Sequence, residues 1–234
     1  MTSDQPHLLL HTYFRSSCTA RVRTALHLKN LPYEPSYLHL LQKEHLSPTY
    51  STINPSASVP TLTITPSSGP KIVIRQSVAI LEFLDEYFPD TPQLLPPLSD
   101  PVRRAKVREL VNILVADVQP PTNLRNLRRL KKIAKGDEEV VNAWAKEIMI
   151  EGLRAFDALA EKYSEGGRYS VGDEVTMADV VLAPAVEGAF RYGVEVKRLG
   201  TVWRIYEEIK GIEAFRRGSW KCQEDTPEEL REKE

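Results

Sequence analysis

A proline-dense stretch near the middle of the chain separates two regions with different secondary-structure signals. Residues 89–101 contain five prolines. Proline fixes φ and has no amide hydrogen, so neither a helix nor a central strand continues through this stretch. Strand and helix patterns alternate before it, and only helical patterns follow it. We therefore expect a mixed α+β domain over residues 1–88, a linker over 89–101 and an all-helical domain over 102–234.

The first region reads as β-α-β followed by β-β-α. Apolar and β-branched runs predict strands at 8–13 and 33–40, and helical spacing of apolar residues predicts a helix at 19–29. Two further short strands, 59–64 and 71–75, flank a Pro/Ser/Gly-rich turn at 66–71 and are expected to form a β-hairpin. Ser77 is expected to cap the helix that follows.

The second region carries helix signals only. Asp100 followed by Pro101 is a typical helix start, because the carboxylate caps the helix and proline suits the first helical position. Further helices are expected over 140–163 and 201–210. The pair Thr176 and Asp179 resembles a capping box before an apolar helix.

Composition and charge narrow the functional classes. Hydrophobic residues make up 41% of the chain, charged residues 27%, and the formal net charge is −1, so neither nucleic acid nor a membrane is an expected partner. The basic run 125–135 is interpreted as a solvated helix face. The N-terminal residues lack the pattern of a signal peptide, which favours a cytoplasmic protein whose two cysteines stay reduced. The spacing of the five histidines predicts no metal site.

The most informative short motif is Ser16-Ser17-Cys18, at the junction between the first strand and the first helix. A helix N-terminus favours anions, thiolates included. These side chains either help to bind such an anion or only cap the helix. Cys18 is not part of a C-x-x-C redox pair, because position 21 is arginine. A catalytic nucleophile is a further possible role of Cys18, and it would need a nearby histidine as base. No histidine is adjacent in sequence, although one could lie close in space.

Several segments together resemble the zeta class of the glutathione transferases. The motif Ser16-Ser17-Cys18-x-x-Arg21-Val22-Arg23 carries the resemblance, together with Val59-Pro60, Gln76-Ser77 and the segment 172–179. The resemblance covers nearly the whole chain. It implies a thioredoxin-like N-terminal domain, an all-helical C-terminal domain and a homodimer. It also implies glutathione as cofactor and the maleylacetoacetate isomerase activity of tyrosine and phenylalanine breakdown.

The resemblance also implies a set of site residues. Ser16, Ser17 and Cys18 are the expected catalytic residues, with Ser16 favoured as the group that activates the glutathione sulfur. The expected contacts to glutathione are Ser16, Ser17, Cys18, His45, Val59, Pro60, Gln76, Ser77, Gln119 and Asn123. His45 stands where the family has a glutamine. Arg15 and Arg191 are the expected cations for a small dicarboxylate substrate.

Each of these residues also has an ordinary structural interpretation. Val59 and Pro60 also fit the start of a strand, Ser77 fits a helix cap, His45 fits a surface loop, and Arg191 fits a surface ion pair. For the whole protein, two alternatives stay open. One is a general glutathione transferase, dehalogenase or peroxidase of the same fold, and the other is a non-catalytic interaction module.

Overall fold

The computed structural model describes residues 5–232, which form two compact units. Among these residues, the first unit holds those up to Gln93 and those from Glu213 onward, and the second unit holds Leu94–Ile212. This grouping differs from the expected boundaries at both ends of the helical region. Leu94 and Leu95 are buried, and the Leu94 carbonyl accepts a hydrogen bond from the Met177 N–H, so the proline-rich segment is partly built into the helical unit.

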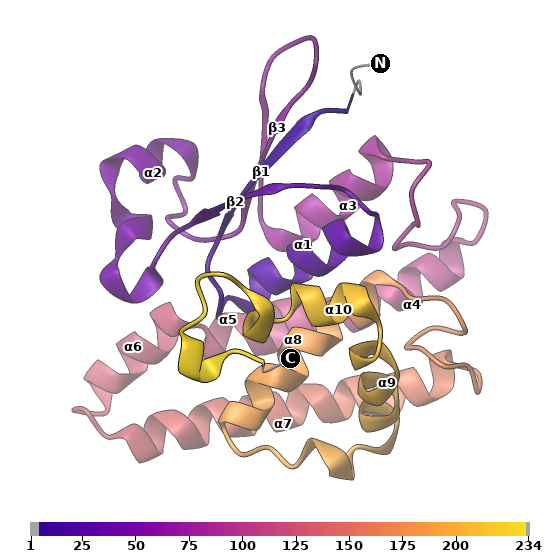
Figure 1. Ribbon diagram of the computed structural model, residues 1–234. Helices are drawn as coiled ribbons and strands as arrows, with labels where there is room; N and C mark the ends of the chain where they lie inside the picture. Colours follow the sequence, from indigo (N-terminus) through magenta and orange to yellow (C-terminus); the bar gives the residue numbers. More distant parts are fainter. Residues whose placement is uncertain (1–4, 233–234) are drawn as a thin grey trace. The chain divides into compact units, whose positions relative to one another are not determined.

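A four-stranded mixed sheet forms the centre of the first unit (Figure 1). Its strands are β1 (His7–Thr12), β2 (Glu34–Tyr37), β3 (Thr61–Thr65) and β4 (Ile72–Arg75), in the order β2-β1-β3-β4. β1 is parallel to β2 and antiparallel to β3, and β3 is antiparallel to β4. The register pairs Thr61 with Arg75 and Ile64 with Ile72, so the predicted hairpin around the 66–71 turn is confirmed.

The first unit contains the two expected helices, α1 (Ser17–Leu28) and α3 (Ser77–Tyr87), and a short third one, α2 (Pro48–Ile53), that was not predicted. α1 packs against α3. The core between the sheet and these two helices is apolar and fully buried, with Leu10, Leu62, Val22, Leu26, Ile80 and Leu84 among its side chains. Every residue of α1 from Thr19 to Leu26 is buried, so this helix is covered on nearly all sides.

The C-terminal segment returns to this unit through α10 (Glu213–Gly218), which packs against α1 (Figure 1). The contact is close because Gly218 has no side chain. A Cβ atom there would lie 2.1 Å from the hydroxyl oxygen of Thr24. Residues 213–234 were expected in the helical domain, because helical spacing alone does not indicate against which neighbour a helix packs.

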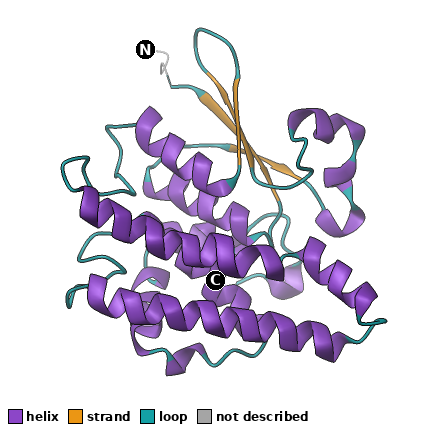
Figure 2. Ribbon diagram, turned by 180° about the vertical axis from the view of Figure 1, so that it is seen from behind, coloured by secondary structure: helices purple, strands orange, loops and turns teal. Residues whose placement is uncertain are grey.

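The regular secondary structure of the second unit is helical in its described residues, with loops between the helices (Figure 2). Its helices are α4 (Pro101–Asn112), α5 (Gln119–Thr122), α6 (Leu124–Ile133), α7 (Glu138–Tyr163), α8 (Met177–Arg191) and α9 (Gly200–Lys210). Asp100 caps α4 through the N–H of Arg103, as predicted. α4 runs directly into a π-helical turn, Ile113–Val118, which sequence analysis did not predict. The expected architecture, a thioredoxin-like α+β domain and an all-helical domain, is confirmed.

The capping box at the start of α8 is present and buried. One carboxylate oxygen of Asp179 accepts from the N–H and the hydroxyl of Thr176, at 2.7 and 3.0 Å. The other oxygen accepts from the N–H and hydroxyl of Ser170, at 2.8 and 2.6 Å. Burial raises the pKa of this carboxyl group, and the four hydrogen bonds act in the opposite direction. Asp179 thereby fixes the loop before α8 as well as the helix end.

None of the helices in residues 5–232 is both long enough and apolar enough to cross a bilayer. Cys18 and Cys222 are both free thiols.

One histidine makes the stability of the first unit depend on pH. His27 lies at the end of α1, and its pKa is lowered to about 4, first by burial and then by the positive charges of Arg217 and Arg23. The unfolded chain binds the proton near pH 6.5, whereas the folded chain does so only near pH 4. Acid therefore favours the unfolded chain over this range, and the contribution of neutral His27 is fully present only above about pH 6.5.

We expect the variant His27→Gln to remove this dependence. The wild-type protein should lose roughly 1 kcal/mol more stability than the variant between pH 7 and pH 5, after allowance for solvent screening at this half-buried site. Urea unfolding at the two pH values measures the difference. Equal losses in the two proteins would contradict the role given to His27.

Candidate active site

α1 begins at the Ser16-Ser17-Cys18 junction. Ser16 is the N-cap, and its hydroxyl oxygen accepts a hydrogen bond from the N–H of Thr19 at 3.2 Å. The hydroxyl hydrogen can still be donated elsewhere, because a serine oxygen accepts and donates at the same time. The side chains of Ser16, Ser17 and Cys18 are half-buried, and the helix end behind them carries a partial positive charge. Capping the helix and donating to a bound anion are therefore compatible roles for Ser16.

One turn further along α1 lies an arginine to which sequence analysis gave no role. Arg21 is only 2% exposed, and burial lowers its pKa. Its Nη1 donates to the hydroxyl oxygen of Ser77 at 3.1 Å and contacts the sulfur of Cys18 at 3.8 Å. Arg21 thus connects the start of α1 to the start of α3. Its position in the motif was visible in the sequence, but its burial and its contact with Ser77 were not.

The segment before β3 presents backbone groups without protein partners. The Val59–Pro60 peptide bond is cis, and both residues are buried. Within residues 5–232, neither the N–H nor the C=O of Val59 forms a hydrogen bond. Buried backbone groups are nearly always paired, so this pair is suited to a peptide-like ligand that adds to the sheet edge.

Tyr50 and Asn54 hold this segment in place. The Tyr50 hydroxyl donates to the Ser58 carbonyl at 2.7 Å, and the Asn54 side-chain amide donates to the same oxygen at 2.8 Å. Both side chains also contact the hydroxyl of Thr61, at 2.8 and 3.0 Å. Sequence analysis did not identify these supports, since they join α2 to the strand start through side chains that local patterns do not reveal.

The start of α3 differs from the expected cap. Gln76, not Ser77, occupies the N-cap position, and Gln76 makes no side-chain capping bond. Its backbone has φ 70°, which is uncommon for a residue other than glycine and costs on the order of 1–3 kcal/mol. Ser77 is the first helical residue, and its hydroxyl is a partner of Arg21 instead of a cap. The first N–H groups of α3 are thus left without a side-chain acceptor, as an anion site requires.

Two other predicted residues of this unit lie at its surface or in a loop. Arg15 is exposed, with its guanidinium carbon 6.0 Å from the centre of the Phe14 ring. His45 is half-buried in a short 3₁₀ turn, Glu44–Leu46.

The remaining predicted residues belong to the helical unit. Asn123 is the N-cap of α6, where its side-chain oxygen accepts from the Asn126 N–H at 2.9 Å. Gln119 begins α5 and is half-buried. Arg191 is the last residue of α8, exposed, with its guanidinium 5.9 Å from the centre of the Tyr192 ring. Asn123 therefore has a structural role of its own, and Arg191 lies at the exposed end of α8.

The loop leading into Ser16 is fixed by two residues that sequence analysis missed. The guanidinium of Arg23 is fully buried and donates to the carbonyls of Tyr13 and Phe14, at 3.4 and 3.2 Å, and to that of Gly218 at 3.0 Å. From the other side, the Phe14 N–H donates to the carboxylate of Asp225 at 2.8 Å. Burial raises the pKa of Asp225. The C-terminal segment is thus a structural part of the site.

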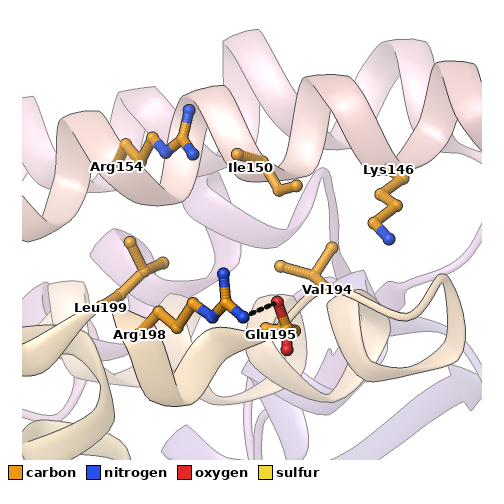
Figure 3. Close-up of a pocket in the computed structure, with 7 residues that line it drawn as sticks. All are labelled: Lys146, Ile150, Arg154, Val194, Glu195, Arg198 and Leu199. Carbon is orange, nitrogen blue, oxygen red and sulfur yellow. Dashed lines mark ion pairs between the residues drawn. The ribbon is translucent and has the colours of Figure 1, made fainter.

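A small cavity of about 170 Å³ lies in the helical unit (Figure 3). Lys146, Ile150 and Arg154 of α7 form one wall, and residues 194–199 form the other, with Arg198 and Glu195 paired at 3.0 Å. None of the predicted site residues lines it. The charged side chains around it are exposed, so the cavity is a surface groove and not the centre expected from the sequence.

Comparison with known proteins agrees with the fold. Residues 15–87 match the family model of the glutathione S-transferase N-terminal domain, and residues 142–217 match that of the C-terminal domain. The maleylacetoacetate isomerase maiA of Aspergillus fumigatus is 46% identical over 230 residues, covering 98% of this chain and 97% of that protein.

Two solved structures are similar over nearly their whole length. A bacterial maleylpyruvate isomerase, described as a zeta-class glutathione transferase, has a TM-score of 0.85 at 36% identity, covering 94% of this chain and 100% of its own. The maleylacetoacetate isomerase of Anaeromyxobacter dehalogenans, with glutathione bound in its active site, has a TM-score of 0.85 at 34% identity, covering 96% and 100%.

We expect Asp225→Ala to loosen the loop before Ser16. The substitution removes the acceptor of the Phe14 N–H, which should cost roughly 1–3 kcal/mol of stability. If glutathione binds beside this loop, its affinity should fall several-fold as well. Chemical denaturation and calorimetric titration with glutathione measure the two effects. Glu229→Ala, which changes an exposed carboxylate of the same segment, is the matched control and should alter neither. If Asp225→Ala is as stable as the wild-type protein, Asp225 does not hold the loop before Ser16 in place.

Proposed function

The chain belongs to the zeta class of the glutathione transferase family, and from this membership we propose that it is a glutathione-dependent cis–trans isomerase. Its proposed substrate is maleylacetoacetate and its product fumarylacetoacetate, as in tyrosine and phenylalanine breakdown. The observation that carries the proposal is the start of α1, where a capping serine, a second serine and a thiol surround a helix end suited to a sulfur anion.

The residues of the first unit fit glutathione. The unpaired N–H and C=O of Val59 match the backbone of its central cysteine, and Pro60 holds Val59 at the strand start. Gln76, Ser77 and the free N–H groups of α3 match the carboxylate of its γ-glutamyl residue. His45 contributes a further polar contact from its loop. When bound, glutathione supplies the sulfur nucleophile for reversible addition to the double bond of the substrate.

Ser16 activates that sulfur as a hydrogen-bond donor. A free thiol has a pKa near 8.5, and lowering it by two units takes about 2.7 kcal/mol. One hydrogen bond to a charged group contributes roughly 1.5–3 kcal/mol, and a helix N-terminus adds roughly 0.3–1 kcal/mol. The Ser16 hydroxyl and the α1 end together supply enough, so no general-base histidine is needed. Ser17 and Cys18 stand beside the sulfur and support its position.

The second substrate carries two carboxylates and therefore needs cations. Arg191, at the exposed end of α8, and Arg15, beside Ser16, are the proposed partners, since a guanidinium holds a carboxylate with two parallel hydrogen bonds. Gln119 and Asn123 are proposed to reach glutathione from the helical unit. Following the family, we also propose that the protein is a homodimer in the cytoplasm.

The activity is tested by following isomerisation of maleylacetone with and without glutathione. We expect turnover only in its presence, and a clear preference for maleylacetone over a neutral chloronitrobenzene or an organic peroxide. In the variant Arg191→Ala, the ratio of turnover of maleylacetone to that of the neutral chloronitrobenzene should fall, while the affinity for glutathione should stay the same. A wild-type protein that favours the neutral electrophile by a wide margin is a general transferase, and one that binds glutathione but turns over none of the three is a binding module.

We expect Ser16→Ala to raise the pKa of the bound glutathione thiol by about one to two units, because the thiolate loses a charge-assisted hydrogen bond. The ultraviolet absorbance of the thiolate, recorded across pH on the binary complex, gives this pKa directly. Isomerisation at pH 7 should fall about 10- to 100-fold. Ser17→Ala is the matched control and should shift the pKa less; the reverse order would make Ser17 the donor.

A further inference from the structure

In the described part of the first unit, two arginines and one lysine are buried, and they differ in which groups neutralise their charge. Lys29 pairs with Asp85 at 2.7 Å and also donates to Thr91 and to the Pro92 carbonyl. Arg23 donates to three backbone carbonyls and to the Thr12 hydroxyl. Both cations are thus surrounded by oxygen atoms, as buried charges in proteins normally are.

Arg21 is the exception. It is 2% exposed, yet no carboxylate in residues 5–232 forms an ion pair with it. Its acceptors are one hydroxyl oxygen, on Ser77, and one thiol sulfur, on Cys18, and both are served by the same nitrogen, Nη1. Its Nε is buried without any acceptor. A guanidinium has five N–H donors, so most of its capacity is unused in the protein alone.

A buried arginine with so few acceptors destabilises the folded protein, unless a further group supplies the missing interactions. A buried charge that lacks a counter-ion is destabilising, and the thiol of Cys18 is a weak acceptor. The counter-ion must then come from a bound ligand. The contacts of Arg21 indicate that this ligand is glutathione. Both contacted residues, Ser77 and Cys18, lie at helix N-termini that the proposed function assigns to glutathione.

Ser77 shows how the charge reaches the ligand. Its hydroxyl oxygen accepts from Arg21, and within residues 5–232 its hydrogen has no acceptor. A hydroxyl that accepts a charge-assisted hydrogen bond becomes a stronger donor itself. The N–H of Ser77 at the uncapped start of α3 lies beside it. Ser77 therefore offers an anion two donors on one residue, with a buried positive charge behind them.

We propose that Arg21 is a positioning residue whose counter-ion is the γ-glutamyl carboxylate of bound glutathione, reached through the hydroxyl of Ser77. This inference rests on the proposed function, since it concerns the same binding site. Arg21 orients and polarises the hydroxyl of Ser77. Because Arg21 also contacts Cys18, it connects the part of the site proposed for the γ-glutamyl carboxylate with the part proposed for the glutathione sulfur. The positive charge of Arg21 therefore serves the binding of glutathione and does not stabilise the ligand-free fold.

The variant Arg21→Met, of similar length but without charge, tests the proposal. Its affinity for glutathione should fall about tenfold in calorimetric titration. The melting temperature of the ligand-free protein should stay the same or rise, because a buried charge without a counter-ion is replaced by an apolar side chain. Arg21→Lys, which keeps the charge, should recover most of the affinity. A structural arginine would instead show a clear drop in the ligand-free melting temperature, and that result would overturn the proposal.

Three probes identify the part of the ligand that Arg21 serves. For Arg21→Met, binding of glutathione and of S-methylglutathione should weaken equally. Binding of the analogue in which 4-aminobutyrate replaces γ-glutamate, and which lacks the carboxylate, should hardly change. If S-methylglutathione is spared while glutathione is weakened, Arg21 acts on the sulfur and the assignment to the carboxylate is overturned.

A double-mutant cycle tests the route through Ser77. If Arg21 acts through this hydroxyl, the double variant of Arg21→Met and Ser77→Ala should bind glutathione about as weakly as either single variant. Additive losses would overturn the coupling. The proposed function can fail independently of this inference: a wild-type protein that does not bind glutathione refutes the function, whereas normal binding by Arg21→Met refutes only the role of Arg21.

Discussion

The guanidinium of Arg23 holds together the part of the structure on which the candidate site is built. It joins the end of β1, the loop that leads to Ser16, and the carbonyl of Gly218 at the end of α10. Gly218 lies 195 positions after Arg23 in the chain. Because the donors of Arg23 match backbone acceptors that would otherwise be buried and unpaired, the position of the loop and the docking of the C-terminal segment depend on one another.

Local signals in the sequence were enough to predict the elements that carry the site. Ser16 was expected at the start of a helix, and it caps α1. The capping box of Thr176 and Asp179 and the hairpin around residues 66–71 were also predicted and are present. In each case the determining interactions lie within a few residues of one another or in a turn, so residue type and spacing are sufficient. The roles given to the site residues rest on the resemblance and stay predictions.

Interactions between distant segments could not be predicted in this way. Ser77 was expected to cap its own helix, but its hydroxyl is a partner of Arg21, fifty-six positions earlier in the chain. The support of the Val59 segment by Tyr50 and the contact of Asp225 with Phe14 are of the same kind. A periodic pattern reports which face of a helix is buried but not which side chain it meets, and these partners are set by the topology of the sheet and by the return of the chain at α10.

The unfavourable features of the first unit are found where the proposed ligand would bind. Gln76 has a backbone angle that few residues other than glycine adopt, the backbone groups of Val59 are buried without partners, and Arg21 is a buried cation without a counter-ion. Each of them opposes folding. A bound glutathione would pair its backbone with Val59 and its γ-glutamyl carboxylate with Arg21 and the start of α3, which would offset this cost. Lys29 and Arg23, the other two buried cations in the described part of this unit, donate to protein oxygens instead. This contrast within one unit argues that the strain belongs to binding, since a chain selected for stability alone would have satisfied Arg21 as it satisfied its neighbours.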